Sequence, residues 1–195
     1  MDLPRKGAHR LKLGLFRPSC TSINGGGIYN TGETATVKVI GCNILGNTAN
    51  QWGGGIGNYN GGKLNVEDSW LRNNKAGSYG GGIDTYISTT TAVKRCLFTD
   101  NVVENGYGGA IEVESDSTLT AVGNVFKGNS ATWGGGISNH ANSKTTVTGS
   151  MFWSNLASSG GGAIYSAKDS ILAQAWNVFK TPTDSILDPP ETNLR

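Results

Sequence analysis

The sequence predicts an all-β fold, a right-handed parallel β-helix of about six to seven coils with about 27 residues per coil. Three observations carry this prediction. A glycine-rich motif recurs six times, a second apolar motif recurs out of phase with it, and no segment has a helical 3.6-residue period long enough to bridge parallel strands. Residues one period apart would then lie directly over one another in successive coils.

The first motif is Gly-Gly-(Gly/Ala)-Ile. Its isoleucines recur at intervals of 28, 27, 28, 26 and 27 residues, at Ile28, Ile56, Ile83, Ile111, Ile137 and Ile164. We expect them to form a buried column along the axis of the solenoid. Glycine suits the sharp corner before each isoleucine, because a Cβ there would clash or be forced to a positive φ.

The second motif places an apolar residue three positions before an asparagine, at Ile44-x-x-Asn47, Leu71-x-x-Asn74, Phe98-x-x-Asn101, Phe126-x-x-Asn129 and Phe152-x-x-Asn155. Phe16 and Phe179 extend the apolar column to seven members. We expect the asparagines at inward-turning corners. There the side-chain amides would bond to the coils above and below, and asparagine tolerates a left-handed backbone.

Short β-rich segments lie between the two motifs. Their shared apolar column consists of Val39, Val66, Val93, Ala121 and Val147, with Gln174 as the exception. Short alternating segments bounded by Gly, Asn, Asp and Ser are typical of strands separated by turns, so we expect two or three strands per coil. Coils stacked about 4.8 Å apart would make a rod roughly 30 Å long.

Composition excludes several other classes. The 195 residues include 30 glycines and 5 prolines, and only 15% are charged, which disfavours a helical bundle because interior glycine weakens helices. Glycine does not recur at every third position, so collagen is excluded. No apolar run approaches the ~18 residues of a membrane helix, and we expect no transmembrane helix.

Charge suggests three regions. We expect a basic N-terminal arm at residues 1–8, a β-helix domain at 9–180, and a C-terminal tail or partial cap at 181–195. Residues 1–17 hold five of the 16 basic residues, and the rest of the chain carries 11 basic against 13 acidic residues. The repeat body would repel phosphate, so no nucleic-acid partner is expected. The N-terminal segment does not have the apolar core of a signal peptide.

The cysteines Cys20, Cys42 and Cys96 are odd in number and lack CxxC spacing, so neither a disulfide framework nor a zinc site is predicted. Cys42 and Cys96 share one column with Ser69 between them, which separates them by two coils or about 9.6 Å. A disulfide needs Cα atoms within about 7 Å, so we expect both to be free thiols. We expect no metal site and no cofactor.

The paired motifs resemble the repeats of the polymorphic outer-membrane protein family, first known from chlamydial surfaces. The resemblance covers about residues 16 to 180, and its architecture is pectin-lyase-like. It implies an extracellular or outer-membrane location, an adhesive role toward a host or cell-surface ligand, and membership of a longer exported chain.

The candidate binding residues form an aromatic column four residues before the isoleucines. Its members are Trp52, Tyr79, Tyr107 and Trp133, in four consecutive coils. An aromatic column with ~4.8 Å spacing would suit the stacking of a polysaccharide, since sugar rings offer apolar faces. The alternative interpretation is that the rings stack on one another and seal the glycine turn.

The candidate catalytic residues are Asp84, Glu112 and His140. Tyr86 and Glu114, on the same outward strand face, are further candidate binding residues. Asp84 and Glu112 occupy equivalent positions one coil apart, close enough to raise the pKa of one carboxyl, and such a pair is the minimum for acid/base cleavage of a glycosidic bond. His140 would serve as a base for a lyase. The alternatives are an ordinary solvated acidic surface and a calcium site that also uses Asp116.

From these observations we predict a non-enzymatic, surface-exposed or secreted repeat module that is adhesin-like or contacts carbohydrate. The alternative is a carbohydrate-active enzyme, either a polysaccharide lyase or a glycoside hydrolase, with its acidic site on the outward strand face. Threonine arrays suited to ice or mineral binding are interrupted across the coils by lysine and glutamate, so no regular lattice is expected.

Overall fold

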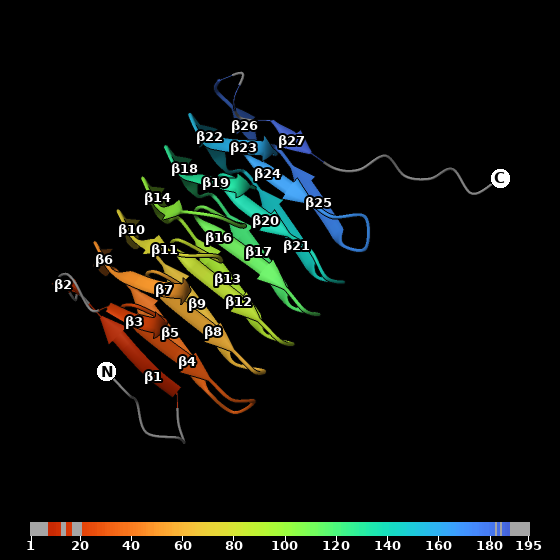
Figure 1. Ribbon diagram of the computed structural model, residues 1–195. Coiled ribbons are helices and arrows are strands. Elements are labelled where there is room, and N and C mark those ends of the chain that lie inside the picture. The colour runs from red at the N-terminus through yellow and green to blue at the C-terminus, as the bar shows by residue number, and fades with distance from the viewer. Residues whose placement is uncertain (1–7, 13–14, 17–20, 182, 184, 188–195) are drawn as a thin grey trace.

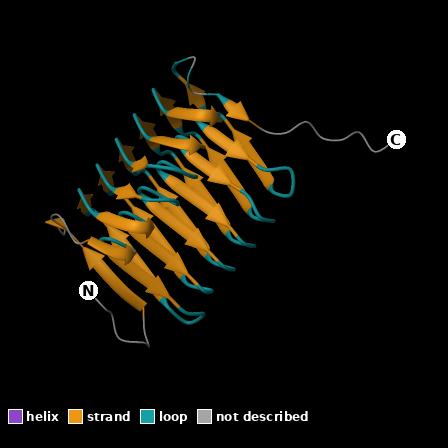
Figure 2. Cartoon of the chain, viewed as in Figure 1, coloured by secondary structure: helices purple, strands orange, loops and turns teal. Residues whose placement is uncertain are grey.

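The protein forms a parallel β-solenoid of about six turns. The computed structural model describes residues 8–12, 15–16, 21–181, 183 and 185–187. Successive coils follow one another along a single axis from the N-terminal to the C-terminal end (Figure 1). The described residues contain strands and loops without a helix (Figure 2), and therefore none that could cross a membrane. The predicted fold class is confirmed.

Each complete coil contributes one strand to each of four parallel sheets, which we call A to D. Sheet A contains β1 (Ala8–Lys12), β5 (Thr36–Ile40), β9 (Lys63–Glu67), β13 (Thr90–Lys94), β17 (Thr118–Val122), β21 (Lys144–Thr148) and β25 (Ile171–Ala175). Sheet B contains β2 (Leu15–Phe16), β6 (Asn43–Leu45), β10 (Trp70–Arg72), β14 (Leu97–Thr99), β18 (Val125–Lys127), β22 (Met151–Trp153) and β26 (Val178–Phe179).

The other two sheets flank the glycine corner. Sheet C contains β3 (Thr21–Asn24), β7 (Thr48–Trp52), β11 (Lys75–Ala76), β15 (Val102–Val103), β19 (Ser130–Trp133) and β23 (Leu156–Gly160). Sheet D contains β4 (Ile28–Thr31), β8 (Ile56–Tyr59), β12 (Ile83–Tyr86), β16 (Ile111–Glu114), β20 (Ile137–Asn139), β24 (Ile164–Ser166) and β27 (Ile186–Leu187). The prediction of two or three strands per coil was therefore wrong. The strands of sheet C are short, and the buried residues that recur in them are small, as at Ala49, Ala76 and Val103.

The predicted stacking of equivalent residues is confirmed. Ile56, Ile83 and Ile111 are paired in register in sheet D, and the isoleucine column is buried from Ile28 to Ile164. In sheet B the rings of the phenylalanine column stack nearly parallel, with centroids 5.0 Å apart for Phe98 and Phe126 and 4.8 Å apart for Phe126 and Phe152. Columns of buried side chains from different sheets thus meet inside the coil and form one continuous core.

The asparagine column forms the predicted ladder at the corner between sheets B and C. The Nδ2 of Asn74 donates to Oδ1 of Asn101 at 2.9 Å, and the Nδ2 of Asn101 donates to Oδ1 of Asn129 at 3.0 Å. The left-handed backbone conformation, however, is adopted by the residue before each ladder asparagine, as at Asn73 (φ 53°) and Asp100 (φ 52°). The ladder asparagines turn inward because the preceding residue makes the bend.

The glycine corner uses its first two positions in different ways. The first glycine has a positive φ, as at Gly80 (φ 58°), where L side chains are strained. At the second position, a Cβ on Gly81 would lie 2.3 Å from the carbonyl oxygen of Gly109 in the next coil. The positive φ therefore applies to the first glycine, whereas a clash with backbone applies to both, since a Cβ on Gly80 would lie 2.3 Å from the carbonyl oxygen of Ile83.

Cys42 and Cys96 form no disulfide with each other, as predicted, and both are buried. Each thiol donates a hydrogen bond to a backbone carbonyl, at 3.4 Å from Cys42 to Ile40 and 3.3 Å from Cys96 to Lys94. Burial raises the pKa of Cys96 to about 11. Cys20, residues 1–7 of the arm and residues 188–195 of the tail lie outside the described residues, and the predicted domain boundaries stay predictions.

Candidate functional site

The candidate site lies on the outer face of sheet D. Each strand of this sheet begins with an inward isoleucine, and the next side chain points away from the core. These outward positions pair in register between neighbouring coils and form what we call the outer column. Its members are Tyr29, Gly57, Asp84, Glu112, Ser138 and Tyr165.

Asp84 and Glu112 are paired in register, as predicted, but neither carboxyl is exposed. Both residues have 0% exposure, so the alternative of a solvated acidic surface was wrong for them. The Tyr59 hydroxyl interacts with the Asp84 carboxyl, and Nε2 of His140 lies 2.7 Å from Oε1 of Glu112. Two carboxyls buried in this way carry a large desolvation cost, which is unusual for a purely structural surface.

Aromatic rings from both sides of the outer column cover the acidic residues. Trp52, which precedes the glycine corner, contacts the rings of Tyr59 and Tyr86 beyond the column, at centroid distances of 6.4 and 5.7 Å. Two coils further along the rod, the ring of Tyr107 contacts the ring of His140, with a centroid distance of 4.7 Å. Because these contacts span the column, water is excluded from Asp84 and Glu112.

The aromatic column is in register across four coils, as predicted. Backbone bridges join Trp52 to Tyr79, Tyr79 to Tyr107, and Tyr107 to Trp133. Tyr79 and Tyr107 stack on each other with centroids 5.9 Å apart and planes 6° apart, as the alternative interpretation expected. Trp133 instead packs against Tyr165, and all four rings of the column are only partly buried.

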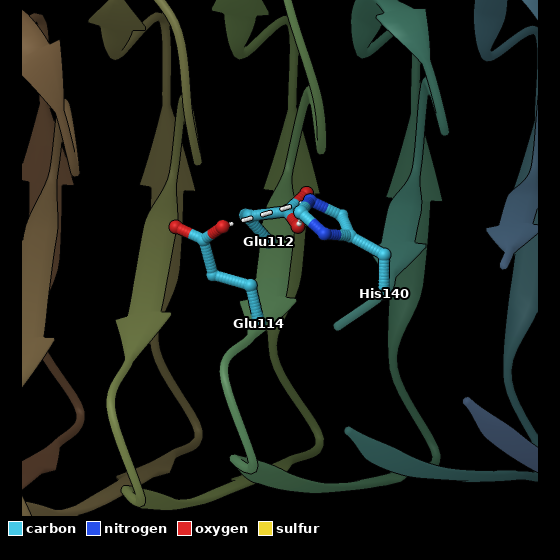
Figure 3. A group of neighbouring side chains, drawn as sticks. All are labelled: Glu112, Glu114 and His140. Carbon is cyan, nitrogen blue, oxygen red and sulfur yellow. Dashed lines mark ion pairs between the residues drawn. The ribbon is translucent and has the colours of Figure 1, made fainter. Parts of the chain in front are cut away.

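Glu114 and His140 bring the acidic cluster to the surface. Nε2 of His140 lies 2.7 Å from Oε1 of Glu112 and 3.7 Å from Oε2 of Glu114 (Figure 3). The side chains of His140 and Glu114 are 19% and 14% exposed, whereas that of Glu112 is fully buried. Glu112 and Glu114 come from β16 and His140 follows β20, so neighbouring coils build the cluster.

Burial dominates the electrostatics of the cluster. It raises the pKa of Asp84 well above the usual range, and the charges of Glu114 and Glu112 raise it further. Burial also raises the pKa of Glu112, while burial and the charge of Glu112 raise the pKa of Glu114 to about 7. Burial alone would lower the pKa of His140, but its contact with Glu112 and the charge of Glu114 raise it.

Sequence reasoning missed Tyr59, which covers Asp84. Its ring folds back over Gly57, where a Cβ would lie 2.3 Å from the ring atom Cε2. Burial and the nearby Asp84 carboxyl raise the pKa of the Tyr59 hydroxyl. The signal in the sequence was the glycine itself, the single member of the outer column without a side chain, two residues before a tyrosine.

Comparison with protein-family models gives one match, described as "Right handed beta helix region", over residues 14–152. The chain belongs to the right-handed β-helix family. Comparisons with curated proteins and with solved structures gave no match. The family match establishes the handedness of this β-helix protein. It does not test the narrower resemblance to the polymorphic outer-membrane proteins, which stays a prediction.

Proposed function

We propose that this β-helix protein is a non-enzymatic module that binds a neutral polysaccharide through the outer face of sheet D. The observation that carries the proposal is the aromatic column, four partly exposed rings held in register on one face of a rod. Consecutive rings repeat along the axis at the coil spacing, about 4.8 Å. A linear sugar polymer can contact such a row over several residues, with its apolar ring faces against indole and phenol.

The chemistry of the face favours a neutral ligand. Most residues gathered there are aromatic or acidic, and the described members of the outer and aromatic columns include no lysine or arginine. A uronic acid polymer would bring more carboxylates toward Glu114. Glu114 and His140 can instead accept or donate hydrogen bonds to sugar hydroxyls at the edge of the aromatic surface.

Burial favours binding over turnover. Asp84 and Glu112 have no exposed surface, so a bound sugar would not reach their carboxyls without movement of the covering rings. A second candidate function, acid/base cleavage of a glycosidic bond, is favoured by the register of these two residues and by the 2.7 Å approach of His140 to Glu112.

Tryptophan substitutions test the binding site. Trp52→Ala and Trp133→Ala are each expected to weaken polysaccharide binding about two- to tenfold, as the loss of one ring contact of about 0.5–1.5 kcal/mol implies. Trp70→Ala and Trp153→Ala are matched controls, because these exposed tryptophans lie on sheet B. Affinity electrophoresis against a panel of neutral and uronic polysaccharides measures the change. Equal losses in all four variants, or none, would refute the site.

The same panel tests the second candidate. Wild-type protein is expected to release neither reducing nor unsaturated ends from any polymer that it binds. Release by the wild type that is abolished in Asp84→Asn and Glu112→Gln would replace the binding proposal with a lyase or hydrolase.

We also propose an extracellular or outer-membrane location as part of a longer exported chain, supported by the repeat motifs. Labelling of intact cells with a membrane-impermeant reagent checks it.

A further inference from the structure

We infer that Glu112, Glu114 and His140 form a binding site for one divalent first-row transition metal ion, with Zn²⁺ as the ion that fits best. The inference does not rest on the proposed polysaccharide binding, although Glu114 and His140 lie at the edge of that surface. The ligand atoms of the three residues all lie within 4.8 Å of one another. Zn²⁺ binds carboxylate oxygen and imidazole nitrogen at about 2.0–2.2 Å, so small side-chain rotations bring all three within reach of one ion.

The single ion pair at the buried end of the cluster leaves one carboxylate oxygen unsatisfied. Oε1 of Glu112 is paired with Nε2 of His140 at 2.7 Å, and Oε2 of Glu112 has no well-aligned hydrogen bond with any residue that the structure describes. Among the described residues, His140 is the only basic side chain in an ion pair with either glutamate. A fully buried carboxylate with unused lone pairs, aimed at an imidazole nitrogen, is the donor arrangement that a cation satisfies.

The open side of the cluster would admit the ion and leave a position for another ligand. Glu114 and His140 are partly exposed and face each other above the buried Glu112 (Figure 3). Three protein ligands with one open position are typical of zinc sites that hold a water molecule or a substrate. Calcium fits less well, because it takes six to eight oxygen ligands and one of the three donors here is nitrogen.

The rigid solenoid makes the ligand set specific to one pair of coils. Glu112 and Glu114 lie two residues apart on β16, on the same face of the strand. On the next coil Asn139 pairs with Val113, so His140 occupies the position equivalent to Glu114. The equivalent residues on the preceding coil are Asp84 and Tyr86, so the glutamate and histidine set occurs at a single level of the rod. A single site per chain therefore follows.

Zinc titration of the whole, metal-free chain tests the inference. Isothermal titration calorimetry with Zn²⁺ is expected to give about one ion per chain, and Glu114→Gln and His140→Gln are each expected to weaken binding at least about tenfold. Asp116→Asn is the matched control, since this exposed carboxylate lies two residues beyond Glu114, and it should bind as the wild type does. His9→Gln, which changes the other histidine of the chain, should also bind normally.

Cobalt gives a second readout that a purely structural role would not affect. Co²⁺ bound to these ligands is expected to produce visible absorption bands that disappear in His140→Gln and persist in Asp116→Asn. Circular dichroism shows whether each variant keeps the β-solenoid. Absence of Zn²⁺ binding to the folded wild type at about millimolar concentration would overturn the inference. So would unchanged affinity in both Glu114→Gln and His140→Gln, or loss in His9→Gln.

Discussion

Asn101 illustrates how single residues hold neighbouring coils together. Its Oδ1 accepts from the backbone N–H of Asn74 at 3.1 Å and from the side chain of Asn74 at 2.9 Å. Its Nδ2 donates to the backbone carbonyl of Leu71 at 2.8 Å and to Asn129 at 3.0 Å. The residue is fully buried, so these bonds have no competition from water. One side chain thus satisfies groups on both adjacent coils.

Replacement of Asn101 by alanine is expected to lower the free energy of unfolding by about 2–4 kcal/mol. The substitution leaves several buried donors and acceptors without partners, and each such group costs about 1–3 kcal/mol. Asn65→Ala on the outer side of β9 is the control and should change stability by about 0.5 kcal/mol or less. Urea unfolding followed by circular dichroism measures both. A loss for Asn101→Ala no greater than that of the control would show that the ladder is not stabilising.

At the same scale, the register of the site was predictable and its burial was not. Glu112 follows Ile111 just as Asp84 follows Ile83, so counting from the isoleucines aligned the two carboxyls. Their exposure depends on where the rings of Trp52 and Tyr107 fold, and the spacing along the chain does not encode that direction. Alternation assigns a side chain to the outer face, but it does not say what covers that face.

At the scale of the element, each glycine corner is a fixed structural unit. Two of the six corners carry alanine in the third position, at Ala110 and Ala163, whereas the first two positions are always glycine. The carbonyl of Gly109 approaches Gly81 from the next coil, and Val102 lies within 2.8 Å of the same Cβ position. Backbone atoms on both sides leave no direction in which the chain can yield.

Gly81→Ala is therefore expected to destabilise the protein by about 3 kcal/mol or more, as overpacking against backbone does. Gly82→Ala should be less destabilising than Gly81→Ala. A Cβ on Gly82 would lie 2.6 Å from the carbonyl oxygen of Ala110, but two other corners accommodate alanine at the equivalent position. Thermal unfolding of the two variants under identical conditions compares them. Equal thermal unfolding midpoints for the two variants would show that a clash with the next coil is not the reason for glycine at the second position.

Element prediction succeeded where columns were apolar and failed where they were small or polar. The phenylalanine and isoleucine columns located sheets B and D, because buried apolar residues recur there in every coil. Sheet C was missed because β11 and β15 are only two residues long, with a lysine beside an alanine in the first and two valines in the second. The residue that recurs in that sheet, two positions after each ladder asparagine, is small, and a column of small residues is a weaker signal than one of large apolar residues.

At the scale of the whole molecule, each coil packs mainly on the coils before and after it. The central coils are covered on both sides, and Phe126 there is fully buried between Phe98 and Phe152. The coil that contains β25 and β26 is less covered: Phe179 is 36% exposed, whereas Phe152, its partner in the same column, is fully buried. In a linear array with nearest-neighbour contacts, stability is lowest where a coil has fewer contacts.

Hydrogen exchange is expected to reveal this gradient along the rod. Amides of β13, β17 and β21 in sheet A should exchange only through global unfolding, since opening any central coil exposes core on two neighbours at once. Amides of β25 in the same sheet should exchange at least about tenfold faster through local opening. Exchange followed by mass spectrometry, on peptides that separate these strands, measures the difference. Equal protection of β25 and β17 would show instead that the solenoid unfolds as a single cooperative unit despite its linear contacts.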